Sequence, residues 1–90
     1  MPIALTPHLI NAAQRSPLPV EYEGRSLTLR STTFMTGSQR FDLEVADGDE
    51  VLGYIAPWDD FEYGAIAASK AGVTPALVRT LDAALVEILR

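Results

Sequence analysis

The sequence contains no cysteine and only one histidine, His8. The absence of cysteine excludes disulfides, a thiolate nucleophile and a zinc ion held by thiolates. None of the serines lies in a nucleophile-elbow context, and no glycine-rich loop of the kind that cradles phosphate occurs. We therefore predict that the protein is not an enzyme and that it binds no cofactor and no metal ion.

Long hydrophobic runs are also missing. No window approaches the ~18 consecutive apolar residues that a membrane span requires, and the first residues lack the basic segment that begins a signal peptide. A chain of 90 residues with 48% hydrophobic and 21% charged residues has the composition of an ordinary globular domain. The sequence thus predicts a single small α+β domain, residues 1–90, that is cytoplasmic and has no membrane contact.

Basic residues are scarce in the second half of the chain. Seven Lys and Arg stand against twelve Asp and Glu, which gives a formal net charge of −5. No Lys or Arg occurs between Arg40 and Lys70, and this interval carries eight carboxylates. An acidic field of this kind repels nucleic acid and attracts basic protein surfaces. Acids that serve only solubility would give the same pattern, so both interpretations stay open.

The first half of the chain predicts a helix followed by strands. Thr6 and Pro7 are typical of a helix start, and Ser16-Pro17 ends that helix. Turn residues and period-two alternation then predict four strands of an antiparallel meander. The expected strands are residues 18–23, 25–34, 40–46 and 51–57, with turns at 23–24, 35–39 and 47–50.

Two helices are expected after the sheet. The alanine-rich residues 64–71 predict a short helix, and residues 74–90 carry a wide apolar stripe at helical spacing. Thr74 and Pro75 would begin this long amphipathic C-terminal helix, which would pack on the sheet. The predicted fold is therefore α+β, with a short N-terminal helix, a four-stranded antiparallel meander, a short helix and a long C-terminal helix.

The register of the last hairpin decides which side chains share a face. A two-residue turn at 47–50 would place Val51 and Ile55 on the same face as Asp42 and Glu44. That face would be apolar on one strand and acidic on the next, and a slip of one residue would reverse the arrangement. Whether other elements cover Val51 and Ile55 stays open; an exposed face would allow a homodimer.

The loop 58–62 mixes aromatic and acidic residues. We expect Trp58 to seat this loop on the domain, because one tryptophan in a small chain is a natural core residue. Asp59, Asp60 and Glu62 would then be exposed as a negative rim, and Tyr63 is expected to be exposed beside them.

These features predict a non-catalytic interaction module that docks an acidic face on a basic surface of a protein partner. Inhibitors, antitoxins, immunity proteins and phage proteins that block nucleic-acid-binding machines are the classes that this build suggests. Carboxylates would stand in for phosphates against Lys and Arg clusters. The candidate contact residues are Asp42, Glu44, Asp47, Asp49, Glu50, Val51, Ile55, Asp59, Asp60, Glu62 and Tyr63.

The alternative is a small DNA-binding regulator. Residues 64–81, "GAIAASKAGVTPALVRTL", resemble the helix-turn-helix pattern, with Gly72 at the turn and apolar residues where two helices would pack. The resemblance implies DNA contacts from the segment 64–83. The candidate DNA-binding residues are Lys70, Thr74, Arg79 and Thr80. The few cations of this segment speak against it, because phosphate contacts supply much of the affinity for DNA.

Overall fold

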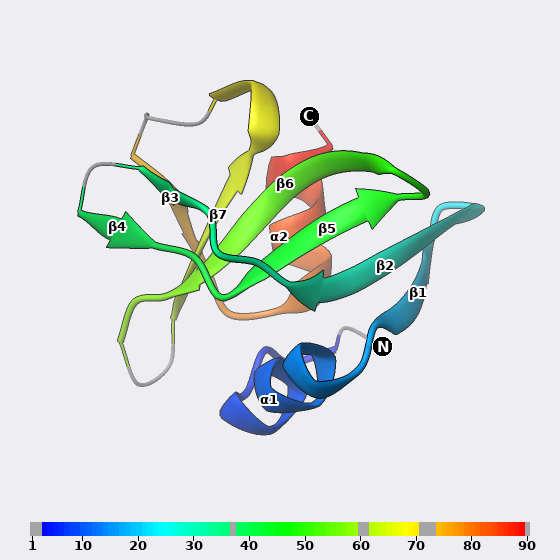
Figure 1. Ribbon diagram of the computed structural model, residues 1–90, viewed down its shortest axis with the longest axis horizontal. Helices are drawn as coiled ribbons and strands as arrows, with labels where there is room; N and C mark the ends of the chain where they lie inside the picture. Colours follow the sequence, from blue (N-terminus) through cyan, green and yellow to red (C-terminus); the bar gives the residue numbers. More distant parts are fainter. Residues whose placement is uncertain (1–2, 37, 60–61, 71–73, 90) are drawn as a thin grey trace.

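The computed structural model describes residues 3–36, 38–59, 62–70 and 74–89. Within these ranges the protein has a six-stranded antiparallel sheet, two short helices and a separate two-stranded hairpin (Figure 1). The strand order in the sheet is β1-β2-β5-β6-β7-β8. The elements are α1 (Pro7–Arg15), β1 (Leu18–Tyr22), β2 (Arg25–Ser31), β3 (Met35–Thr36), β4 (Gln39–Arg40), β5 (Leu43–Asp47), β6 (Glu50–Pro57), β7 (Tyr63–Ala67), η1 (Ala68–Lys70), β8 (Ala76–Val78) and α2 (Leu81–Ile88).

The α+β class is confirmed, but the prediction of four strands followed by a long C-terminal helix is wrong. Residues 64–67, the first part of the segment expected to be helical, belong instead to the strand β7 (Tyr63–Ala67). Every residue of β7 is buried, because α2 covers one face of the strand and a second apolar cluster lies on the other. A short apolar run that is buried on both faces has no period that separates strand from helix.

The C-terminal helix is shorter than predicted. Residues Ala76–Val78 form the edge strand β8, and α2 begins only at Leu81. Its N-cap is Thr80, whose hydroxyl oxygen accepts a hydrogen bond from the backbone N–H of Ala83 at 3.1 Å. A second Thr that can cap therefore replaces Thr74, and the intervening residues extend the sheet instead.

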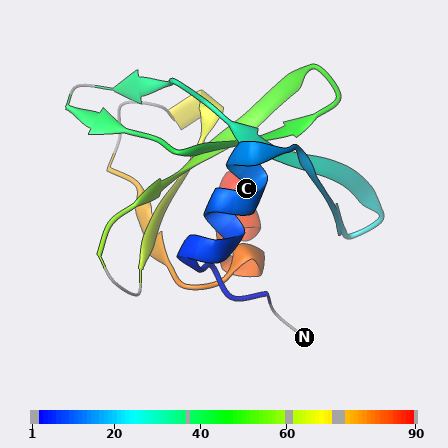
Figure 2. The ribbon, with the colours of Figure 1, turned by 60° about the horizontal axis from the view of Figure 1, so that its bottom comes forward.

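The N-terminal helix lies where it was predicted. The Thr6 hydroxyl oxygen accepts from the backbone N–H of Leu9 at 3.1 Å, and Pro7 occupies the first turn. The helix buries Ile10 and Ala13 against β2 and β5. Figure 2 shows that both helices lie on the same side of the sheet. The main core lies between that side and the helices, and includes Leu29, Val45 and Leu85.

The other side of the sheet carries a smaller aromatic cluster. Phe34 stacks on Tyr54 with ring centroids 4.0 Å apart and an interplanar angle of 6°. Phe41 is tilted against both rings and is fully buried together with Ala56 and Ile66. Because Phe34 precedes β3 and Phe41 follows β4, the cluster attaches the small hairpin to the sheet.

A β-bulge sets the register of the β5–β6 hairpin. Val45 pairs with Gly53, whereas Ala46 pairs with Val51, so Leu52 is the extra residue on β6. The shift pairs Glu44 with Tyr54 and Leu43 with Ile55. The predicted face that combined Val51 and Ile55 with the acids is therefore wrong, because Ile55 belongs to the core beneath the helices.

Candidate functional site

Two hairpin tips at one end of the sheet gather most of the exposed acids. The first tip joins β1 to β2 and has positive φ at Glu23 and Gly24, as a tight hairpin turn requires. The second joins β5 to β6 and has positive φ at Gly48. We call these two turns, with the residues that pair across them, the acidic hairpin end. Its carboxylates, all exposed, are those of Glu21, Glu23, Asp47, Asp49 and Glu50.

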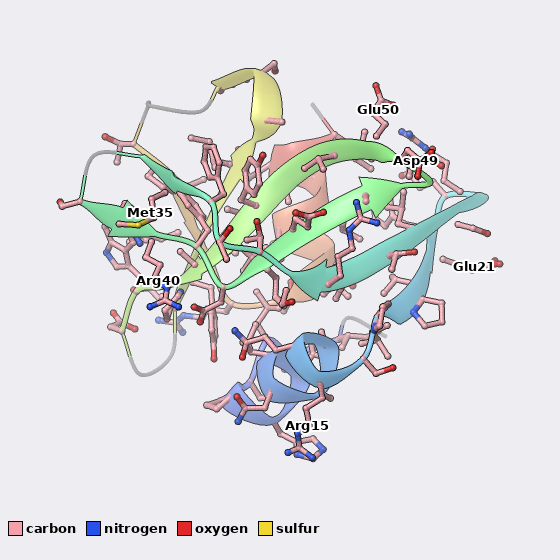
Figure 3. The ribbon with its side chains drawn as sticks, in the orientation of Figure 1. Arg15, Glu21, Met35, Arg40, Asp49 and Glu50 are labelled. Atoms are coloured by element: carbon pink, nitrogen blue, oxygen red, sulfur yellow. The ribbon has the colours of Figure 1, made fainter. Side chains whose placement is uncertain are left out.

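An ion pair connects the two tips. The guanidinium of Arg25 donates to a carboxylate oxygen of Asp47 at 3.0 Å, and both side chains are a little under half exposed. Arg25 is the one cation within these two turns and the residues that pair across them. The acidic hairpin end therefore has five carboxylates and one guanidinium, a formal charge of −4. Figure 3 shows Glu21, Asp49 and Glu50 together at this end, and Met35 and Arg40 at the other.

The acids predicted as one face fall into separate groups. The strand β6 spans eight residues, Glu50–Pro57, so its ends lie about 23 Å apart at ~3.3 Å per residue. Asp47, Asp49 and Glu50 lie at one end, and Asp59 and Glu62 follow the other. Asp60 lies outside the described residues. Only the first group joins further acids, from the β1–β2 turn.

Several predicted contact residues are not available at the surface. Ile55 is fully buried and Tyr63 is nearly so. Glu44 accepts a hydrogen bond from Arg30 Nε across the β2–β5 pair, and its side chain is only 15% exposed. Val51 is half-buried on the strand that leaves the acidic hairpin end. Glu44 is therefore already neutralised within the domain, and Ile55 and Tyr63 serve its core.

Asp42 lies next to buried Tyr63 and exposed Arg40. Partial burial raises the pKa of Asp42, and the charge of Arg40 offsets part of this effect. Burial also raises the pKa of the Tyr63 phenol, and the negative charge of Asp42 raises it further. The Asp42 carboxylate is thus partly buried and interacts with Arg40 and Tyr63, so it is not part of an open acidic face.

The loop after β6 is tied by its own hydrogen bonds. The backbone N–H of Glu62 donates to the Asp59 carboxylate at 2.8 Å, and the N–H groups of Trp58 and Asp59 both donate to the Glu62 carbonyl. Trp58 is 44% exposed, so the expectation that it is a core residue is wrong. One edge of its ring instead lies over Gly64, where the absent side chain leaves room for it.

A groove runs beside the acidic hairpin end on the helix side of the sheet. It encloses about 300 Å³ between β6, η1 and the C-terminal part of α2. Its surface mixes polar and apolar atoms, and Arg25, Glu50 and Ser69 are its polar lining residues. The apolar lining residues are Val51, Leu52, Ala67, Ala68, Ile88 and Leu89.

The helix-turn-helix prediction is wrong for the described part of residues 64–83. This segment contains β7, the 3₁₀ turn η1, β8 and only the first residues of α2; residues 71–73, with Gly72, lie outside the described ranges. Lys70 ends η1, Thr74 precedes β8, Arg79 follows it and Thr80 caps α2. DNA binding by these four residues stays a prediction, but the paired helices that suggested it are absent from the described residues.

Glu21 and Glu23 belong to this site, although the sequence did not predict them as site residues. Counting charge along the chain placed them in a half that is basic overall, whereas the antiparallel pairing of β2 with β5 brings their turn beside the acidic one. Two signals, Glu23-Gly24 and Asp47-Gly48, marked both turns. The pairing of the strands between them was also implied by the predicted meander, so this group of acids could have been anticipated.

Among the residues that the structure describes, no three His, Asp or Glu side chains are grouped so that they could hold a metal ion. No helix in the described ranges is long and apolar enough to cross a membrane. Comparison of the chain with known family models, with curated proteins and with solved structures finds no match.

Proposed function

We propose that the protein is a non-catalytic interaction module that docks its acidic hairpin end on a basic surface of a protein partner. The single observation that carries this proposal is the group of five exposed carboxylates on two adjoining turns with one guanidinium among them. The expected biological class is that of inhibitors, antitoxins, immunity proteins and phage blocking proteins, acting in the cytoplasm. Docking would occlude the partner's Lys and Arg cluster by presenting carboxylates where that cluster otherwise meets phosphates.

The position of these charges supports docking. Hairpin tips project from the end of a rigid sheet, so their carboxylates reach a partner's surface before the rest of the domain does. At physiological salt, charges interact over about 8 Å, and like charges gathered in one patch add their fields within that range. Such a patch raises the association rate with a basic surface, and the gain falls as salt rises.

Titration with a short lysine- and arginine-rich peptide tests the proposal. The double variant Asp49→Asn/Glu50→Gln should weaken the binding of this peptide roughly tenfold at low salt and flatten its salt dependence. Glu62→Gln/Asp82→Asn is the matched control, because it changes the net charge equally at sites away from the hairpin tips. Equal losses in the two double variants would mean that the overall charge, and not the acidic hairpin end, attracts the peptide.

A further inference from the structure

We infer that the groove beside the acidic hairpin end takes an apolar side chain from the same basic segment of the partner, so that the recognised element is amphipathic rather than merely cationic. This inference rests on the proposed function and adds the chemistry of the partner to it. It concerns the groove lined by β6, η1 and the C-terminal part of α2.

The groove has an apolar floor next to a charged rim. Ile88 of α2 forms part of the floor and packs so closely on β6 that a Cβ placed on Gly53 would lie 2.6 Å from its Cγ2 atom. Val51, Leu52 and Leu89 are half-buried, so part of their apolar surface faces solvent. Covering such surface is favourable in proportion to the apolar area that leaves water.

The charges around the groove select the occupant. Glu50 lines the groove itself, and Asp49 precedes it on the same turn. Arg25 also lines the groove, but its guanidinium is held by Asp47 at 3.0 Å. Lys70, which ends η1 next to Ser69, is a second cation near the groove. The five carboxylates of the acidic hairpin end still outnumber these two cations, so the field favours Lys or Arg beside the apolar residue and disfavours an acidic segment.

A second copy of this chain fits the groove less well than a basic segment. Its own acidic hairpin end would meet the same charges, and like-charge contact is unfavourable. A wholly cationic peptide would pair with the carboxylates and leave the apolar lining residues exposed to water. A segment with one apolar residue between Lys and Arg residues satisfies both parts at once.

Two peptides distinguish these cases. One has lysines and arginines around a central leucine, and the other has alanine in place of that leucine. We expect the leucine peptide to bind roughly tenfold more tightly, because the leucine adds buried apolar area that alanine cannot supply. Ser69→Tyr should remove this preference, since Ser69 is exposed and lines the groove, where a ring would take the leucine's place. Ser31→Tyr is the control on an exposed strand end away from the groove.

Each outcome decides a different claim. A preference for leucine that Ser69→Tyr removes and Ser31→Tyr retains supports the groove. Equal, salt-sensitive binding of both peptides overturns the groove inference and leaves the proposed function standing, whereas binding of neither peptide overturns both. Self-association of the protein in sedimentation velocity that Ser69→Tyr abolishes would assign the groove to a second copy and overturn the inference.

The wild-type protein provides a measurement that needs no variant to fold. In ¹H–¹⁵N spectra, the leucine peptide should shift the amide signals of Ser69 and Leu89, which line the groove away from the turn, clearly more than the alanine peptide does. Identical shifts with both peptides at these amides would contradict the inference.

Discussion

Arg25 of β2 donates to Asp47 of β5 at 3.0 Å, and this ion pair extends the β2–β5 pairing to the turns of two hairpins that are separate in sequence. The same guanidinium is the one cation within the two turns and the residues that pair across them, where five carboxylates lie. The pair is therefore both a connection between the two tips and a partial neutralisation of the surface that we propose to bind a partner. These two roles predict opposite effects on stability and on binding.

Removing the guanidinium should separate the two effects. Arg25→Gln should lower the free energy of unfolding by less than about 1 kcal/mol, because exposed ion pairs contribute little. The same change takes the acidic hairpin end from −4 to −5 and should tighten the binding of a lysine- and arginine-rich peptide. Urea denaturation and peptide titration measure the two quantities, with Arg15→Gln on α1 as the control for net charge. Weaker peptide binding in Arg25→Gln would show that Arg25 itself contacts the ligand.

The less exposed pair, Arg30 with Glu44, should behave differently. Arg30→Leu leaves the Glu44 carboxylate with little solvent and without its partner, so we expect a loss of about 2 kcal/mol in the free energy of unfolding. The double variant Arg30→Leu/Glu44→Leu removes both charges and should recover most of that loss. Urea denaturation of Arg30→Leu, Glu44→Leu and the double variant gives the coupling energy between Arg30 and Glu44. Additive losses would contradict the interpretation of this pair as mutually dependent.

Gly53 allows β6 and α2 to approach each other. A Cβ at this position would lie 2.5 Å from the Ile66 carbonyl oxygen and 2.6 Å from Ile88 Cγ2. Gly53→Ala should therefore lower the free energy of unfolding by about 2 kcal/mol, as overpacking of a rigid site does.

Gly64→Ala is the matched comparison for Gly53→Ala. Its Cβ would lie 3.1 Å from Pro75 and 3.2 Å from the ring of exposed Trp58, which can move aside. We expect it to cost less than about 1 kcal/mol in thermal or urea unfolding. A larger loss for Gly64→Ala than for Gly53→Ala would contradict the close packing of α2 on β6.

Asp42 makes stability depend on acid pH in a particular direction. Burial raises the pKa of Asp42 above its ordinary value of 3.8, so the folded state holds the proton more tightly than the unfolded state does. This group therefore contributes stability below about pH 3.8 that is lost as pH rises through the raised folded-state pKa. At neutral pH, the ionised Asp42 carboxylate lowers the free energy of unfolding.

The variant Asp42→Asn tests this direction. The free energy of unfolding of Asp42→Asn should exceed that of the wild type by more at neutral pH than at about pH 3. Asp49→Asn on the hairpin tip serves as the control for a lost charge. Asp42→Asn should also lower the pKa of the Tyr63 phenol, because it removes one of the two causes of that raised pKa. An unchanged tyrosine titration would show that the Asp42 charge does not act on Tyr63.

The elements with specific end signals could be predicted from the sequence, and the elements without them could not. Thr6-Pro7 fixed α1, and Glu23-Gly24 and Asp47-Gly48 fixed two hairpins. The strand β7 could not be separated from a helix, because residues buried on both faces show no period of two. The same holds for the candidate site. The two turns that carry its acids have local sequence signals, whereas the burial of Ile55 and Tyr63 depends on how the strands pair and could not be predicted.

The bulge at Leu52 illustrates a second limit. One extra residue on β6 exchanges the faces of the strand, so Ile55 enters the core and Tyr54 joins Phe34 on the other side. Gly53, next to Leu52, is a residue that often marks a bulge inside a strand, but it does not specify which residue is extra or that the register shifts. What did follow from the sequence was the acidity of the 47–50 turn, because a hairpin tip is exposed in either register.

The most direct test of the central claim is a titration of ¹⁵N-labelled protein with a lysine- and arginine-rich peptide at low and high salt. We predict that the amide signals of the two hairpin turns, those of Glu21, Glu23, Asp49 and Glu50, shift at low salt and return towards their free positions at high salt. The amides of Asp59 and Glu62, at the other end of β6, should change little and act as an internal control. Shifts that centre on Asp59 and Glu62, or that persist unchanged at high salt, would contradict electrostatic docking through the acidic hairpin end.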